Sequence, residues 1–252
     1  LDLPEHDIAD PSTIIDTVVG FQPDVVIHAA AMTDVDGCER DPELAFRVNA
    51  LGTQNMALAC GETGATMVHI STNDLFDGRL NRAYHEWDTP SPQSVYSQSK
   101  AAAEFYVRTL LRRFFIVRTA WLYGREGSNF VTKIIATADR HGALRVVTDE
   151  VSAPTYAPDL ARAIGQLLPT KHHGVFHFTN SGICSRYDWA CKILELSGRE
   201  NVPIEPITGD EWQRAAAPPL YAPLMNLAGA ALGIVLRPWE QALQEYFQSE
   251  QP

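Results

Sequence analysis

Tyr96 and Lys100 are the two side chains whose types and spacing best fit a chemical reaction. They lie four residues apart in a segment with helical periodicity, so both project from one helix face. A tyrosine hydroxyl can donate a proton to a carbonyl group that receives a hydride, but its ordinary pKa of about 10 hinders exchange at neutral pH. A nearby lysine ammonium lowers that pKa. The spacing alone is also typical of an exposed helix face, so the surrounding elements are needed to distinguish a catalytic pair from a solvated one.

Two further features lie where a parallel sheet would bind a ligand. Thr72 follows a predicted strand, and ligands of open α/β sheets bind at the carboxyl ends of the strands. Its hydroxyl could bind the same substrate oxygen as Tyr96, although a turn-forming role is the alternative. Ala29, Ala30 and Ala31 end an earlier predicted strand. Their small side chains would let a flat ligand approach the backbone, although tight packing also explains them.

Strands and helices alternate along the first part of the chain. Short apolar runs predict buried strands, and longer periodic segments predict helices. Their order predicts an α/β fold of the Rossmann type, in which helices cover both faces of a doubly wound parallel sheet. The predicted strands are residues 24–30, 66–71, 114–119 and 144–147, and the predicted helices are residues 42–61, 95–113 and 128–141.

Prolines divide the second part of the chain into shorter pieces. Helices are predicted at residues 159–168 and 186–197, and a strand at residues 175–178. We therefore expect a Rossmann-like dinucleotide-binding domain over residues 1–150. A smaller substrate-binding lobe should cover residues 151–252 and pack over the carboxyl edge of the sheet, with an exchange of chain between the two units left open.

Charge and composition exclude several classes of protein. A net charge of −11 in 252 residues argues against nucleic acid as the main partner. No apolar run approaches the roughly 20 residues that a membrane helix needs, and no signal peptide is recognisable. The four cysteines lack C-x-x-C spacing, so they indicate a reducing cytoplasm and no metal site is expected.

Several motifs, in order along essentially the whole chain, resemble one family. The sequence is most similar to the dTDP-4-dehydrorhamnose reductase family of the extended short-chain dehydrogenases/reductases. The matching stretches are PDVVIHAAAMTDVD at residues 23–36, VNA at 48–50, STNDLFDG at 71–78, PQSVYSQSK at 92–100, RTAWLYG at 118–124, PT at 154–155, DLA at 159–161 and ALGIVLRPW at 231–239. This succession is far more specific than the Tyr96 and Lys100 pair.

The resemblance implies a cofactor, NADPH or NADH, and a catalytic set. It assigns Tyr96 as the general acid, Lys100 as the residue that tunes it and holds the nicotinamide ribose, and Thr72 as the group that binds the keto oxygen. The residues that the resemblance places along the cofactor are Asp7, Ile8, Ala29, Ala30, Ala31, Tyr96 and Lys100.

The resemblance also implies a substrate site. Trp121 would pack against the sugar, and Asp74 would lie near it, where the family usually carries a tyrosine. Asn129 and Arg214 would contact the nucleotide or the sugar. The alternatives are a core position for Trp121, a helix N-terminal cap for Asn129 and a solvated side chain for Arg214.

Three further departures from the family pattern are visible. Ser97 follows Tyr96 where a glycine is usual, and a second arginine near Arg214 is lost. The Gly-rich turn that normally cradles the pyrophosphate at the start of this fold is missing, since Gly20 is the first glycine. We therefore expect the sequence to be a fragment of a longer native chain, and it does not reveal a preference for NADH or NADPH.

The activity that the resemblance implies is reduction of the 4-keto group of a nucleotide-activated deoxysugar, with dTDP-4-dehydro-L-rhamnose converted to dTDP-L-rhamnose. Two alternatives stay open. One is another extended short-chain enzyme, an epimerase or a dehydratase. The other is a non-catalytic regulatory subunit similar to that of methionine adenosyltransferase. The expected partner is the nucleotide sugar in the cytoplasm, with neither nucleic acid nor membrane, and a homodimer stays an open question.

Overall fold

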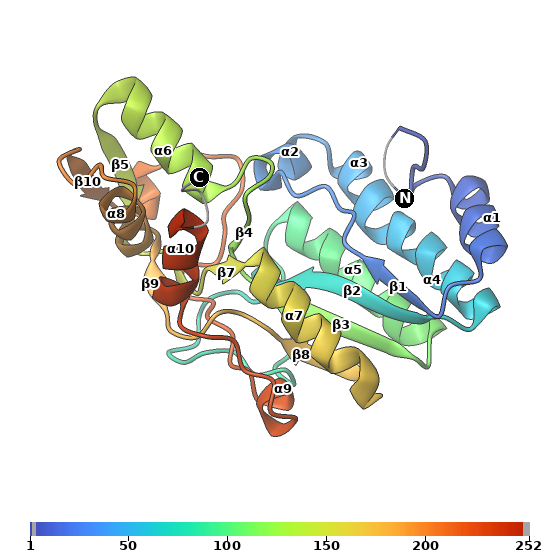
Figure 1. Ribbon diagram of the computed structural model, residues 1–252. Helices are drawn as coiled ribbons and strands as arrows, with labels where there is room; N and C mark the ends of the chain where they lie inside the picture. Colours follow the sequence, from blue (N-terminus) through green and yellow to red (C-terminus); the bar gives the residue numbers. More distant parts are fainter. Residues whose placement is uncertain (2–3, 249–252) are drawn as a thin grey trace.

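Four apolar segments form a parallel sheet at the centre of the protein, whose computed structural model describes residues 1 and 4–248 (Figure 1). The strand order is β1-β2-β3-β8, and every neighbouring pair is parallel. Long crossover connections between these strands carry the helices. The strands are β1 (Val25–His28), β2 (Thr66–Thr72), β3 (Phe114–Thr119) and β8 (Gly174–His177).

Helices cover both faces of this sheet (Figure 1). On one face, α1 (Pro11–Phe21), α4 (Gly52–Thr63) and α5 (Val95–Leu110) share a buried cluster with β2 and β3. On the other face, α7 (Ala157–Leu167) and α9 (Ala228–Ala231) pack against β3 and β8. The predicted Rossmann-type α/β fold is therefore confirmed. No described helix has the length and apolar character needed to cross a membrane.

A π-helical turn interrupts the helix that was predicted over residues 42–61. It covers Arg47–Leu51, between α3 (Pro42–Phe46) and α4. The turn directs Asn49 inward, where its Oδ1 accepts a hydrogen bond from Met32 N at 2.7 Å and its Nδ2 donates to Ser99 Oγ at 3.0 Å. Asn49 thereby fixes the loop after β1 to helix α5. Such turns occur often at functional sites.

A second packing unit contains the strand predicted at residues 144–147. The expectation that this strand joins the main sheet is wrong: β5 (Leu144–Val147) pairs in parallel with β10 (Ile204–Ile207) in a separate sheet. The apolar residues of β5 are buried against Trp189 and Ile193 instead of against the main sheet. The helices of this unit are α6 (Phe130–His141), α8 (Arg186–Leu196) and α10 (Trp239–Gln248).

The chain exchanges segments between the two packing units on either side of residue 150. Helix α6 and strand β5 precede that residue but pack in the second unit, whereas α7 and β8 follow it and pack on the main sheet. Two short strand pairs, β4 with β7 and β6 with β9, lie between the units. The remaining elements are β4 (Leu122–Tyr123), β6 (Val151–Ser152), β7 (Thr155–Tyr156), β9 (Cys184–Ser185), α2 (Val35–Arg40) and the 3-10 turns Asn73–Leu75, Leu168–Thr170 and Gly209–Glu211.

Candidate active site

The start of helix α5 places Tyr96 and Lys100. Ser94 and Ser97 form a capping box: Ser97 N donates to Ser94 Oγ at 3.1 Å, and Ser94 N donates to Ser97 Oγ at 3.0 Å. This cap fixes the first helical residue as Val95, so Tyr96 lies in the first turn and Lys100 follows one turn later. The serine at position 97, where a glycine is usual in the family, therefore contributes directly to the cap.

A buried ion pair fastens α5 to the sheet below the site. Arg118 on β3 donates to both carboxylate oxygens of Glu104, from Nε at 2.8 Å and from Nη2 at 2.7 Å. Ser71 on β2 donates to the same carboxylate at 2.7 Å. Arg118 is fully buried, and a two-point pair in such surroundings fixes orientation as well as distance. This pair holds the helix that carries Tyr96 over the carboxyl ends of β2 and β3.

The predicted catalytic residues line one cavity of about 500 Å³. Thr72 ends β2, Tyr96 and Lys100 come from α5, and Ala29 and Ala31 come from the loop after β1. The cavity lies at the carboxyl ends of the strands, where ligands bind in this class of sheet. Trp121 lines it as well, so the structure brings together six of the predicted residues from segments that are far apart in the sequence.

The surroundings of Tyr96 oppose its ionisation. Burial raises the pKa of the phenol, and so does the Asp74 carboxylate, while a hydrogen bond with Thr72 lowers it. Lys100 directs its Nζ to the carbonyl oxygen of Ile70 at 2.7 Å. Burial lowers the pKa of Lys100 to about 8, against a raising effect of Glu104. In this arrangement Tyr96 is a protonated phenol next to a hydroxyl group, and a lysine lies in the same cavity.

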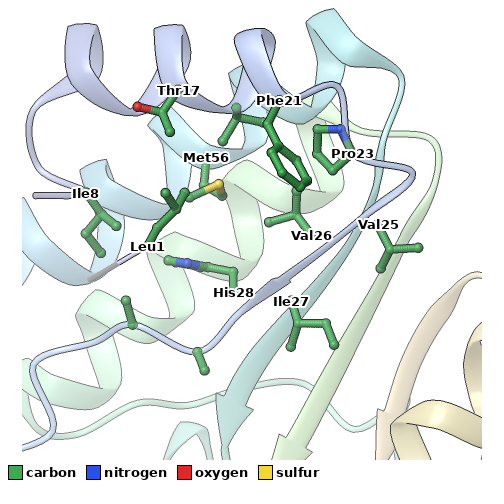
Figure 2. A pocket seen from close by; sticks show the side chains of 13 residues that line it. Leu1, Ile8, Thr17, Phe21, Pro23, Val25, Val26, Ile27, His28 and Met56 are labelled. Atoms are coloured by element: carbon green, nitrogen blue, oxygen red, sulfur yellow. The ribbon is translucent and has the colours of Figure 1, made fainter. Parts of the chain in front are cut away.

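A second hollow, of about 670 Å³, shares Ile27 and Ala29 with the first. It lies between α1 and β1, with Ile8 and Met56 at its side (Figure 2), and Ala30 also lines it. Ile27 of β1 is 56% exposed. Asp7 does not line the hollow: it is exposed, and its carboxylate accepts a hydrogen bond from Ala9 N at 2.9 Å.

A third, charged pocket of about 90 Å³ contains Asp74 and Arg214. Glu150 is the centre of its charge network, because its carboxylate pairs with Arg214 and lies 3.6 Å from Arg186 Nε. The side chain of Glu150 is only 5% exposed. Trp121 lines both this pocket and the catalytic cavity. The predicted substrate residues Asp74, Trp121 and Arg214 therefore lie around two connected spaces.

The carboxyl group of Asp74 titrates close to neutrality. Its surroundings together raise its pKa to about 6: burial is the main cause, Arg186 and Arg214 act against it, and Glu150 adds to it. A tyrosine at this position, as in the family pattern, would carry no charge at neutral pH. The substitution therefore places a titratable group beside Tyr96, with two guanidinium groups near it.

Trp121 adopts an unusual backbone conformation. Its φ of 46° lies in the left-handed region, which side chains of this size rarely adopt. Its carbonyl oxygen accepts a hydrogen bond from Thr155 N at 3.2 Å, and the Arg186 guanidinium carbon lies 3.8 Å from its ring centroid. Strained residues of this kind concentrate at ligand sites. The backbone thus directs the indole into the wall between the two pockets.

Asn129 lies outside the three pockets. Its side-chain oxygen accepts hydrogen bonds from Val131 N at 3.0 Å and Thr132 N at 3.2 Å, and its amide donates to Gly124 O at 2.8 Å. The side chain therefore forms the N-terminal cap of α6, which was the alternative to a substrate contact. Glu150 and Arg186 were missed by sequence reasoning, because residues 36 positions apart in separate elements leave no periodic signal.

The residues of the catalytic cavity fit a nicotinamide nucleotide. Ala29 and Ala31 contribute only small side chains to the wall at the end of β1, and Lys100 supplies a cation. Thr119 also lines the cavity, and its hydroxyl oxygen is buried without a hydrogen-bond partner among the described residues. A buried, unpaired hydroxyl of this kind is explained when a ligand completes the site.

Comparisons with known proteins agree with this geometry. The family model described as RmlD substrate binding domain matches residues 1–251. The spore coat polysaccharide biosynthesis protein SpsK of Bacillus subtilis is 39% identical over 96% of this chain and 84% of its own length. The dTDP-4-dehydrorhamnose reductase of Mycobacterium tuberculosis (strain H37Rv) is 37% identical over 95% of this chain and 80% of its own length.

A solved structure extends the agreement to three dimensions. The dTDP-4-dehydrorhamnose reductase of Bacillus anthracis in complex with NADP superposes with a TM-score of 0.96 at 36% identity, over 99% of this chain and 89% of that one. Both the sequence motifs and the arrangement of the strands are thus shared over nearly the whole chain. This protein therefore belongs to the dTDP-4-dehydrorhamnose reductase family of the extended short-chain dehydrogenases/reductases.

Proposed function

We propose that this protein uses NADPH or NADH to reduce the 4-keto group of a nucleotide-activated deoxysugar, dTDP-4-dehydro-L-rhamnose, to give dTDP-L-rhamnose. The convergence of Thr72, Tyr96 and Lys100 on one cavity carries the proposal. The relatives named dTDP-4-dehydrorhamnose reductase and the NADP complex support it. A cytoplasmic location and assembly as a homodimer belong to the same proposal, and cell fractionation and size-exclusion chromatography would test them.

The proton chemistry follows from the state of Tyr96. A reduced nicotinamide in this cavity would supply hydride to the carbonyl carbon. Tyr96 then donates its phenolic proton to the carbonyl oxygen, and Thr72 stabilises the charge that develops there by hydrogen bonding. Because burial and Asp74 raise the pKa of Tyr96, the phenol keeps its proton at neutral pH until that charge develops.

Lys100 would hold the cofactor ribose. Its Nζ has one donor directed to Ile70 O, so the other two are available to hydroxyl groups in the same cavity. Trp121 provides an apolar wall for the sugar, and Arg214 would contact the sugar from the charged pocket. Asn129 is assigned no substrate contact, because its side chain is used in the helix cap.

The test is oxidation of NADPH and NADH with dTDP-4-dehydro-L-rhamnose, measured with the natural full-length protein. We expect Tyr96→Phe to lower kcat by about 10²–10⁴-fold, because the proton donor is removed while the ring is kept. Tyr106→Phe is the matched control, since Tyr106 lies on the same helix but lines none of the described pockets. It should keep the wild-type rate.

Two results would contradict the proposal. A fully active Tyr96→Phe variant would remove the general-acid assignment. Absence of turnover in the wild-type protein, with cofactor binding retained in a fluorescence titration, would favour the non-catalytic regulatory role over the reductase.

A further inference from the structure

Asp74 lies beside the position expected for the reacting carbonyl group. Its backbone N–H donates to Thr72 Oγ1 at 3.1 Å, and its carboxylate is close enough to Tyr96 to affect the ionisation of the phenol. Thr72 and Tyr96 are the two residues assigned to the carbonyl oxygen. A substrate atom within reach of Asp74 therefore lies near the reacting carbon.

No side chain among the described residues donates a hydrogen bond to the Asp74 carboxylate, although this group is partly buried in the charged pocket. Arg186 and Arg214 act on it through space. The carboxylate oxygens are therefore open to the pocket, where a hydroxyl group of a ligand can supply the donor.

Arg186 offers the complementary donors. Glu150 contacts it at Nε, 3.6 Å away, and Trp121 lies under its plane with 3.8 Å from Cζ to the ring centroid. These two contacts fix the plane of the guanidinium and leave its terminal nitrogens for the pocket. Its side chain is 22% exposed, so it is largely withdrawn from water but still accessible.

The size of the charged pocket limits what it can hold. About 90 Å³ corresponds to roughly three water-sized groups, at about 30 Å³ each. A sugar ring does not fit in it, but a ring substituent does. The pocket meets the catalytic cavity at Trp121, so a ring that lies in the cavity would extend its neighbouring substituent into the space between Asp74 and Arg186.

We propose that Asp74 and Arg186 together bind the hydroxyl group on the carbon next to the reacting carbonyl, so that the protein selects keto sugars hydroxylated at that carbon over their deoxygenated analogues. This proposal rests on the proposed reductase function. One hydroxyl satisfies both residues, because it donates a hydrogen bond to the carboxylate and accepts one from the guanidinium. Asp74 occupies the position at which the family pattern has a tyrosine, so this pair departs from that pattern.

The expected selectivity arises because a substrate without this hydroxyl group leaves both Asp74 and Arg186 without their hydrogen-bond partner. Sites built to hydrogen-bond a hydroxyl reject the analogue without it by up to about 10⁴–10⁵-fold. Here the rejection should be smaller, because Asp74 and Arg186 attract one another when no hydroxyl is present. We therefore expect kcat/KM to favour the hydroxylated substrate by about 10²–10³-fold.

The experiment compares dTDP-4-dehydro-L-rhamnose with its 3-deoxy analogue at saturating NADPH in the natural full-length protein. Asp74→Leu and Arg186→Gln should reduce the ratio of the two kcat/KM values to about 10-fold or less, mainly through the hydroxylated substrate. Arg214→Gln is the matched control from the same pocket: it should change both values by the same factor and leave the ratio intact. Binding of the two alcohol products to the wild type gives a second readout that depends on neither turnover nor the folding of variants.

The possible results distinguish failure of the specificity role from failure of the proposed reductase function. Wild-type turnover of both substrates with a ratio below 10, or variants that keep the wild-type ratio, would overturn the role of Asp74 and Arg186 while the reductase function stands. Equal affinity for the two products would overturn it as well. Turnover of neither substrate would overturn the proposed function and the specificity role together.

Discussion

Replacing Lys100 by methionine tests how strongly the active-site lysine is destabilised by burial. The pKa of Lys100 is lowered from 10.5 to about 8, with burial as the main cause, and its residue is 3% exposed. At 1.36 kcal/mol per pKa unit, keeping the ammonium charged in the folded protein at pH 7 costs about 3 kcal/mol. Methionine has a similar length and carries no charge, so Lys100→Met removes that cost.

The substitution also removes the hydrogen bond from Nζ to Ile70 O, which is 2.7 Å long. A hydrogen bond to a charged group contributes about 1.5–3 kcal/mol. At pH 7 the variant should therefore be as stable as the wild type, or more stable by up to about 1.5 kcal/mol, even though it loses a catalytic residue.

The dependence on pH separates the charge from the hydrogen bond. The folded pKa of Lys100 lies below its unfolded value, so between about pH 8 and 10.5 the unfolded chain binds more protons and wild-type stability rises with pH. Between pH 7 and pH 9.5 the free energy of unfolding of the wild type should gain about 2 kcal/mol relative to Lys100→Met.

Urea unfolding of both proteins across this pH range measures the difference between their free energies of unfolding. The contributions of all other titrating groups are the same in both proteins and cancel in that difference. Lys133→Met, at an exposed position on α6, is the matched control and should run parallel to the wild type. Parallel curves for Lys100→Met as well would refute the reasoning that burial destabilises this lysine.

Three further predictions concern the interior. Glu104→Gln should lower the free energy of unfolding by about 3–5 kcal/mol in urea titrations, because it leaves the Arg118 guanidinium buried and unpaired; a loss below 1 kcal/mol would contradict this. Gly229→Ala should lower the free energy of unfolding by about 1–3 kcal/mol, because its Cβ would lie 2.3 Å from Cε1 of Phe178. Gly165→Ala on α7 is the control: its Cβ would meet nothing within 4 Å, so in thermal unfolding it should be neutral or stabilising. Equal effects of the two changes would contradict the steric argument. Burial lowers the pKa of His177 to about 3, so its ring should stay neutral down to about pH 4 in an NMR titration. Because the unfolded chain binds the proton more readily, the free energy of unfolding should fall as the pH drops from about 6.5 towards 3. A titration midpoint above about pH 5 would contradict this.

The sequence predicted the main sheet well because burial and local pattern agree there. β2 and β3 are buried along almost their whole length, and Ser94 before Tyr96 marks the start of α5. The partner of β5 could not be predicted in the same way. It is β10, a short strand that contains Pro206 and therefore lacks the pattern of an ordinary strand.

In the candidate site, too, residues marked by a local pattern could be predicted and residues that meet only through long-range packing could not. Thr72 and Tyr96 could be recognised, because each follows or opens a well-defined element. The contact between Glu150 and Arg186 depends on how the second packing unit folds back over the sheet, and nothing local reports it. An asparagine is suited both to a helix cap and to a ligand contact, so the sequence could not assign a role to Asn129. Its hydrogen-bond partners in the structure identify it as a helix cap.

The left-handed backbone of Trp121 has a consequence for anyone who improves this protein by selection. A bulky residue in that region costs on the order of 1–3 kcal/mol in backbone strain. The indole offsets that cost, because its ring stacks on Trp189 with 5.6 Å between the centroids and carries the Arg186 guanidinium on one side. A library screened for heat resistance alone should therefore keep an aromatic residue at position 121, so selection for survival also preserves the wall between the two pockets.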